Sequence, residues 1–96
     1  MIDKKSVVVT AKDKRYSNLN QDTVILDLKS EEYYGLNHVG STVWRLLQKP
    51  VAVEEIQELI LSKYDVGAEE CFRDLKAFLE NLEAQELIKV LEPASV

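Results

Sequence analysis

The sequence has a single cysteine, Cys71, so the chain cannot form a disulfide bond within itself. A structural zinc site would have to use the one histidine, His38, and carboxylates in place of the usual thiolates. No apolar run approaches the roughly 18 residues that a membrane helix needs. The first residues, Met-Ile-Asp-Lys-Lys-Ser, lack the apolar segment and cleavage site of a signal peptide. These absences predict a cytoplasmic protein that contacts no membrane and holds no metal or other cofactor.

The residue patterns of common active sites are also missing. There is no Walker loop and no Gly-x-Gly-x-x-Gly motif, which excludes the usual nucleotide-binding loops. A cysteine nucleophile needs a base that keeps it as a thiolate, and His38 stands at the start of a predicted helix, where it caps the helix or faces solvent. Cys71 therefore fits a small apolar side chain on a helix face better than a reactive thiol. Glu31 and Glu32 have the pattern of a solvated turn, so we expect no catalytic residue and no enzyme activity.

The net charge of −5 is unevenly distributed along the chain. Residues 1–20 carry five basic side chains and two acidic ones, a local charge of +3, so the remaining residues sum to −8. An acidic body repels a phosphate backbone, whereas proteins that bind nucleic acid usually present a basic face. The charge pattern therefore favours a neutral or basic partner over nucleic acid, although an acidic surface also serves ordinary solubility.

The N-terminal third of the chain has strand patterns. Val7–Thr10 is a β-branched run and predicts a strand, whereas residues 12–20 are polar and contain turn-forming residues, which predicts a loop. Thr23–Lys29 alternates between two faces, as expected of a half-buried strand. A third strand over residues 32–36 follows a tight connection, which predicts an antiparallel hairpin. One face of the second strand carries Val24, Leu26 and Leu28, and the other carries Thr23, Ile25, Asp27 and Lys29.

The rest of the chain shows helical periodicity. Residues 37–47 predict a first helix with Asn37 as its N-cap, Val53–Lys63 a second, and Ala68–Gln85 the longest. Residues 87–91 close the domain as a short strand or an apolar tail. The fold class is therefore α+β, similar to a winged helix-turn-helix, with a three-stranded antiparallel N-terminal sheet followed by three helices in one domain, residues 1–96.

The third predicted helix has the wrong charge for reading DNA. It offers Arg73 and Lys76 against five acidic residues, Glu69, Glu70, Asp74, Glu80 and Glu83. Arginine and lysine supply most contacts to phosphates and guanine in the major groove. A transcriptional regulator stays open as a less favoured function, because a dimer could present the basic residues 4–15.

The junction between the third strand and the first helix is the candidate binding site. Aromatic side chains and two carboxylates lie there beside a sheet edge, which is typical of peptide docking, although a strand packed in the core is the competing interpretation. A stripe on the third helix, Cys71, Asp74 and Phe78, follows helical spacing next to the core face.

Several motifs together resemble the family of pyrroloquinoline quinone biosynthesis protein D. The run Tyr-Tyr-Gly-Leu-Asn-His-Val-Gly-Ser-Thr-Val-Trp-Arg-Leu-Leu over residues 33–47 is similar to its signature. Val53, Glu55 and Ile56 and then Tyr64 follow in the family's order. The Asp-Leu-x-x-Phe-Leu-x-x-Leu pattern over residues 74–82 completes a resemblance that covers roughly residues 22–91.

The resemblance implies a leader-recognition domain, which captures the leader segment of a ribosomally made precursor peptide. In such domains the leader adds as a strand to the edge of the third strand and packs against the third helix. Carried over to this sequence, the implied peptide-binding residues are Glu31, Glu32, Tyr33, Tyr34, Gly35, Leu36, Cys71, Asp74, Leu75 and Phe78.

The size of the chain is most similar to the stand-alone recognition proteins of lasso-peptide pathways. That resemblance implies two further partners, a separate leader peptidase and a cyclase. The alternatives are a peptide chaperone for a radical SAM enzyme and, outside the family, a structural subunit that binds a folded protein through an apolar patch. We expect a monomer or a weak dimer formed through the free strand edge.

Overall fold

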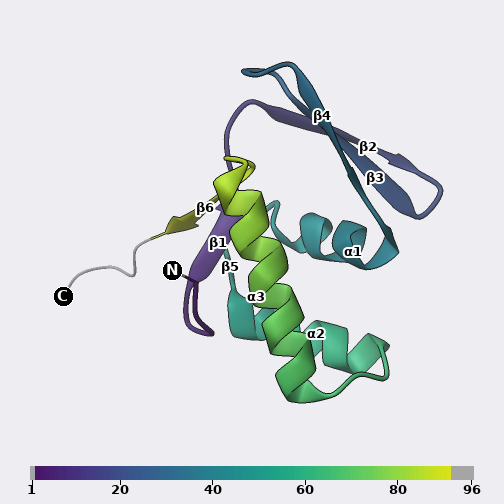
Figure 1. Cartoon of the computed structure of the whole chain (residues 1–96), viewed down its shortest axis with the longest axis vertical. Coiled ribbons are helices and arrows are strands. Elements are labelled where there is room, and N and C mark those ends of the chain that lie inside the picture. Colours follow the sequence, from purple (N-terminus) through teal and green to yellow (C-terminus); the bar gives the residue numbers. More distant parts are fainter. Residues whose placement is uncertain (1, 92–96) are drawn as a thin grey trace.

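The computed structural model describes residues 2–91 of the chain (Figure 1). The α+β prediction, antiparallel strands followed by three helices, is confirmed in these residues, and the helices end within about one residue of their predicted bounds. Residues 1 and 92–96 of the predicted domain lie outside the described residues. The elements are β1 (Val7–Thr10), β2 (Lys14–Leu19), β3 (Asp22–Asp27), β4 (Glu32–Leu36), α1 (His38–Leu46), β5 (Val51–Ala52), α2 (Val53–Lys63), α3 (Ala68–Ala84) and β6 (Ile88–Leu91).

The described strands form two antiparallel sheets of three strands each. One is a meander in the order β2-β3-β4, in which Leu26 of β3 lies between Arg15 of β2 and Tyr33 of β4. The other has the order β5-β1-β6, and in it Val7 pairs with both Ala52 and Leu91. Figure 1 shows the meander at the upper right, above α1, and the second sheet beside the upper part of α3.

Two assignments made from the sequence are wrong. Residues 14–19, inside the predicted loop 12–20, form β2, in which residues 15–19 are all exposed. Because β2 is an edge strand with little buried surface, its polar sequence lacks the alternation that marks a half-buried strand. The N-terminal sheet therefore consists of β2, β3 and β4, and the first predicted strand, β1, joins β5 and β6 instead.

β3 buries the face that carries Ile25 and two polar residues, Thr23 and Asp27, and leaves Val24 and Leu26 half-buried on the other. The Asp27 carboxylate accepts hydrogen bonds from Lys14 Nζ at 3.2 Å and from the backbone N–H of Lys29 at 2.9 Å. Burial raises the pKa of Asp27, but these hydrogen bonds outweigh it and lower the pKa from 3.8 to about 2. The strand therefore accommodates an internal carboxylate because that carboxylate is paired.

α3 ends in a Schellman motif, which turns the chain back into β6. The N–H of Leu87 donates to the carbonyl of Leu82 at 2.9 Å, and the N–H of Glu86 donates to the carbonyl of Glu83 at 2.9 Å. Glu86 occupies the position where glycine is usual and has a φ of 61°. Leu82 and Leu87 are both buried, so the turn is also fixed by packing.

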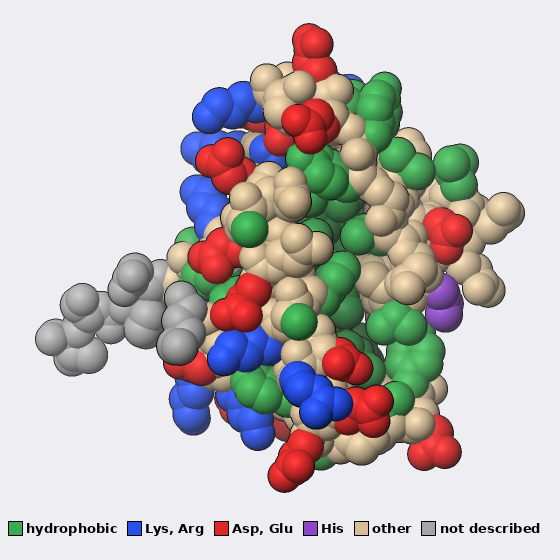
Figure 2. Space-filling model, in the orientation of Figure 1, with side chains coloured by type: hydrophobic (Ala, Val, Ile, Leu, Met, Phe, Trp, Pro, Cys, Tyr) green, Lys and Arg blue, Asp and Glu red, His purple; other side chains and the backbone are tan. Residues whose placement is uncertain are grey.

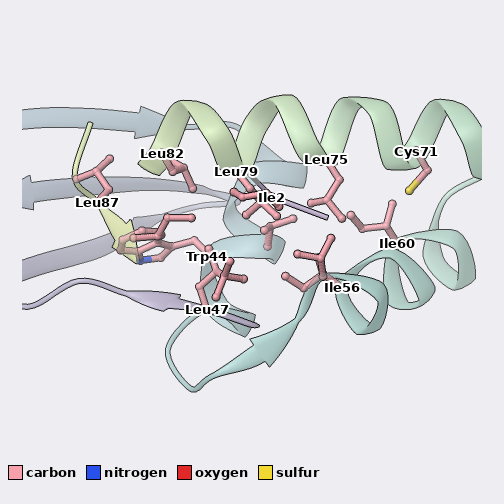
Figure 3. Packing of buried hydrophobic residues seen from close by; sticks show 14 of the residues in the cluster. Ile2, Trp44, Leu47, Ile56, Ile60, Cys71, Leu75, Leu79, Leu82 and Leu87 are labelled. Carbon is pink, nitrogen blue, oxygen red and sulfur yellow. The ribbon is translucent and has the colours of Figure 1, made fainter. Parts of the chain in front are cut away.

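The core lies between α3 and the other helices. Figure 3 shows side chains of α3 directed toward those of α1 and α2, with Trp44 and Leu47 next to the sheets. Trp44 is fully buried, and its ring meets Tyr16 of β2 edge-on at a centroid distance of 6.1 Å. This core fixes α3 against α1 and α2. No helix within residues 2–91 is both long enough and apolar enough to span a membrane.

Candidate peptide-binding site

β4 (Glu32–Leu36) is an edge strand, as the sequence predicts. It pairs with β3 on one side, and no other strand in residues 2–91 pairs with its second edge. An edge of this kind presents backbone N–H and C=O groups without partners in the sheet, and an added strand can bind them. β4 therefore supplies the backbone half of a peptide-binding site.

An open groove of about 470 Å³ lies beside the C-terminal end of β4. Its walls come from the end of β4, the start of α1, the end of α2 with the segment after it, and the first half of α3. Figure 2 shows hydrophobic side chains gathered in a hollow near the middle of this face. The groove is lined by Gly35, Leu36, Asn37, Val39, Gly40, Val43, Ile60, Tyr64, Val66, Glu70, Cys71, Asp74, Leu75 and Phe78.

The structure brings six of the ten predicted site residues together in this groove. They come from two elements that are distant in the sequence, β4 and α3, and they are Gly35, Leu36, Cys71, Asp74, Leu75 and Phe78. Cys71 and Leu75 are only 6% and 4% exposed and form its floor. Phe78 is half-buried and Asp74 is exposed, so they stand higher on the wall.

The other four predicted residues lie outside the groove lining. Glu31 forms the turn before β4 with a φ of 62°, and Tyr33 is 70% exposed on the outer face of the meander. The Tyr34 hydroxyl donates to Glu32 Oε2 at 3.1 Å and lies 3.4 Å from Gln85 Oε1 at the end of α3. Burial, followed by the hydrogen bond to Glu32, raises the pKa of Tyr34. These residues border the start of the free edge, and their contact with a peptide stays a prediction.

The start of α1 contributes groove residues that the sequence-based prediction missed, Asn37, Val39, Gly40 and Val43. Asn37 caps α1 as predicted, accepting from the Gly40 N–H at 2.9 Å. A Cβ atom on Gly40 would lie 3.3 Å from Phe78 Cζ, so the missing side chain permits close approach of α1 and α3. A glycine inside a predicted amphipathic helix is the signal that could have indicated this contact.

The prediction also missed lining residues from α2, from the segment that follows it and from the first turn of α3, namely Ile60, Tyr64, Val66 and Glu70. Val66 is 43% exposed, which is high for an apolar residue in a short connection. Glu70 stands four residues before Asp74, and this spacing on one helix face was visible in the sequence. The position of Ile60 and Tyr64 depends on packing between helices.

The groove contains a thiol, Cys71, whose surroundings do not activate it. Burial raises the pKa of Cys71, and the Asp74 carboxylate raises it further, so the thiol is not activated. His38 is outside the lining, with its ring 6.1 Å from that of Tyr64. Within residues 2–91, no group of three histidine, cysteine, aspartate or glutamate residues is placed to hold a metal ion. The groove therefore offers an apolar floor, two carboxylates and a free strand edge.

A family model described as coenzyme PQQ synthesis protein D matches residues 22–88. This chain belongs to that family. The match runs from the first residue of β3 to the first residue of β6, so it includes β4, α1, α2 and α3, which all contribute to the groove. The resemblance that the sequence indicates over residues 22–91 is thereby confirmed.

Two solved structures resemble this member of the PqqD family over most of its length. TbiB1 in complex with the TbiA(beta) leader peptide has a TM-score of 0.79 and 31% identity, with 91% of this chain and 99% of that chain covered. Lasso peptide synthetase B1 complexed with the leader peptide has a TM-score of 0.77 and 20% identity, with 85% and 96% covered. The second likeness shows the fold alone. No curated protein matches the chain.

Proposed function

We propose that this protein binds the leader segment of a ribosomally synthesised precursor peptide. The leader adds as a strand to the free edge of β4, and its side chains enter the groove. The observation that carries the proposal is the position of an apolar groove directly beside an edge strand. An extended peptide on that edge turns every second side chain toward α3, so backbone pairing supplies affinity and the groove supplies selectivity.

The comparisons support this proposal. TbiB1, at 31% identity and nearly full coverage of its chain, forms a complex with a leader peptide. The family match includes every element that lines the groove. In our proposal Cys71, Leu75 and Phe78 contact an apolar leader side chain, and Glu31, Glu32, Tyr33 and Tyr34 border the incoming strand at the start of β4.

We further propose that the bound leader is delivered to separate enzymes of a lasso-peptide pathway, a leader peptidase and a cyclase. The protein itself contributes no catalytic residue and acts in the cytoplasm, where the precursor is made. The likeness to TbiB1 favours this pathway. The description of the family, which names coenzyme PQQ synthesis, favours the alternative of a peptide chaperone for a radical SAM enzyme.

A titration of the isotope-labelled protein followed by NMR tests the proposal. The probe is a synthetic leader from the precursor gene nearest to the gene of this protein. We expect saturable shifts, at micromolar or tighter affinity, concentrated in residues 32–36 and α3. Amide hydrogen exchange should slow at the N–H groups of β4 that face the free edge, because the added strand bonds them.

A scrambled peptide of the same composition is the matched control, and duplex DNA is the second. Shifts that are identical for the leader and the scrambled peptide would contradict specific capture. Shifts with DNA in the basic residues 4–15, without any response to the leader, would favour the regulator instead. Slower exchange in β4 without added peptide, at high protein concentration, would indicate the edge-strand dimer.

A further inference from the structure

Two carboxylates, those of Glu70 and Asp74, stand on the α3 wall of the groove. They are four residues apart and therefore share one face of the helix, and both are exposed at the rim. Like charges at this spacing repel and lower the stability of a helix. Glu70 is compensated by its place in the first turn, next to the positive end of the helix dipole. Asp74 stands beyond that turn, so the helix dipole does not compensate its negative charge.

Within the described residues no cation neutralises this pair of carboxylates. The ion pair found in residues 2–91 joins Lys14 and Asp27 of the meander, and no lysine or arginine lines the groove. The residues three and four positions from Asp74 in the helix carry no positive charge, namely Glu70, Cys71, Ala77 and Phe78, whereas Arg73 stands three positions after Glu70. The groove therefore combines an apolar floor with a negative rim, on which Asp74 has neither an ion pair nor a cation at helical spacing within the described residues.

We infer that the groove selects leaders in which a lysine or arginine stands two positions from the apolar side chain that enters it. Residues i and i+2 of an added strand face the same way, so the apolar side chain reaches the floor while the cation reaches Asp74, with Glu70 beside it. A long basic side chain suits this rim because its stem covers apolar surface while its charge stays in water. The inference rests on the proposed function and adds the chemical class of the leader.

Stability and affinity should respond in opposite directions when Asp74 is neutralised. Removing the charge of Asp74 relieves its repulsion with Glu70 within α3, so the melting temperature of Asp74→Asn stays the same or rises. The same change removes the partner of the leader cation, so binding weakens. A merely structural role for Asp74 would lower the melting temperature and the affinity together.

The experiment compares Asp74→Asn, Glu70→Gln and the double variant with Glu69→Gln, an exposed carboxylate of the same helix turn that does not line the groove. The probe is the synthetic leader used in the titration. We expect each groove substitution to raise the Kd roughly two- to fivefold, and the double variant to show the shallowest dependence of the Kd on salt. Glu69→Gln should leave the Kd and its dependence on salt unchanged.

A second series replaces each lysine or arginine of the leader by glutamine. One such replacement should weaken binding to the wild-type protein and have no further effect on the double variant, which lacks both carboxylates. The inference would be overturned if the double variant bound the leader with unchanged affinity, or if no replacement of a leader lysine or arginine changed the Kd. Either result would leave leader capture standing. A leader that fails to bind the wild-type protein at all would overturn both proposals.

Discussion

Cys71 illustrates how the surroundings of a single residue decide its chemistry. The thiol lies on the floor of the groove and is 6% exposed. Burial raises its pKa and the neighbouring Asp74 carboxylate raises it further, so the reactive thiolate is scarce at neutral pH. The interpretation of Cys71 from the sequence, a small apolar side chain on a helix face, agrees with this environment.

We predict that alkylation of Cys71 by iodoacetamide follows a pH profile with a midpoint above the ordinary cysteine pKa. Asp74→Asn should move the midpoint downward but leave it raised, because burial is the larger cause. Mass spectrometry of the modified protein gives the rates. Glu80→Gln, on the same helix but outside the groove lining, serves as the control with the same change of charge. Rapid alkylation at neutral pH would contradict the prediction.

At the scale of elements, the sequence predicts the helices and strands whose apolar residues recur at regular spacing. All three helices follow from apolar spacing, and Asn37 marks the start of α1. β2 does not follow, because residues 15–19 are exposed and their pairing with β3 leaves no apolar alternation to detect. The apolar spacing places the end of α3 within one residue, but the Schellman turn itself is hidden in the sequence, since glutamate stands where glycine is usual.

Substitution of Glu86 tests whether its positive φ costs stability. We expect Glu86→Gly to raise the free energy of unfolding by about 0.5–1 kcal/mol, because glycine adopts the positive φ without the penalty of a side chain. The same exchange in the middle of α3, Glu80→Gly, should lower it by about 1 kcal/mol. Urea unfolding followed by tryptophan fluorescence measures both. A loss of stability in Glu86→Gly would show that the glutamate side chain stabilises the turn.

At the scale of the whole molecule, the groove forms where elements distant in the sequence come together. Local patterns and the family resemblance were enough to select β4 and α3 as its walls. The contributions of Val43, Ile60 and Tyr64 could not be read from the sequence, because packing between α1, α2 and α3 brings them to the groove. Burial of the Lys14–Asp27 pair was likewise hidden, since Lys14 fell in a predicted loop.

Asp27 predicts how the stability of the whole molecule responds to acid. Its pKa is about 2 in the folded protein, below the ordinary value of 3.8, so its contribution is present above the ordinary value and is lost as the pH falls from 3.8 toward 2. The midpoint of urea unfolding should therefore decline through this window. In Asp27→Asn we expect a lower midpoint at neutral pH, because Lys14 loses its partner, and a shallower decline in acid. An equally steep decline in the variant would assign the acid response to other carboxylates.

The pairing of β1 with β6 has a consequence for the order in which the molecule is built. The meander joins neighbours in the sequence, and its hairpins can close as soon as they leave the ribosome. Val7 must instead wait for Leu91, so the second sheet closes only after nearly all of the described chain has been synthesised. Until then β1 lacks its longest partner strand, and a truncated nascent chain exposes an apolar strand to its neighbours on the polysome.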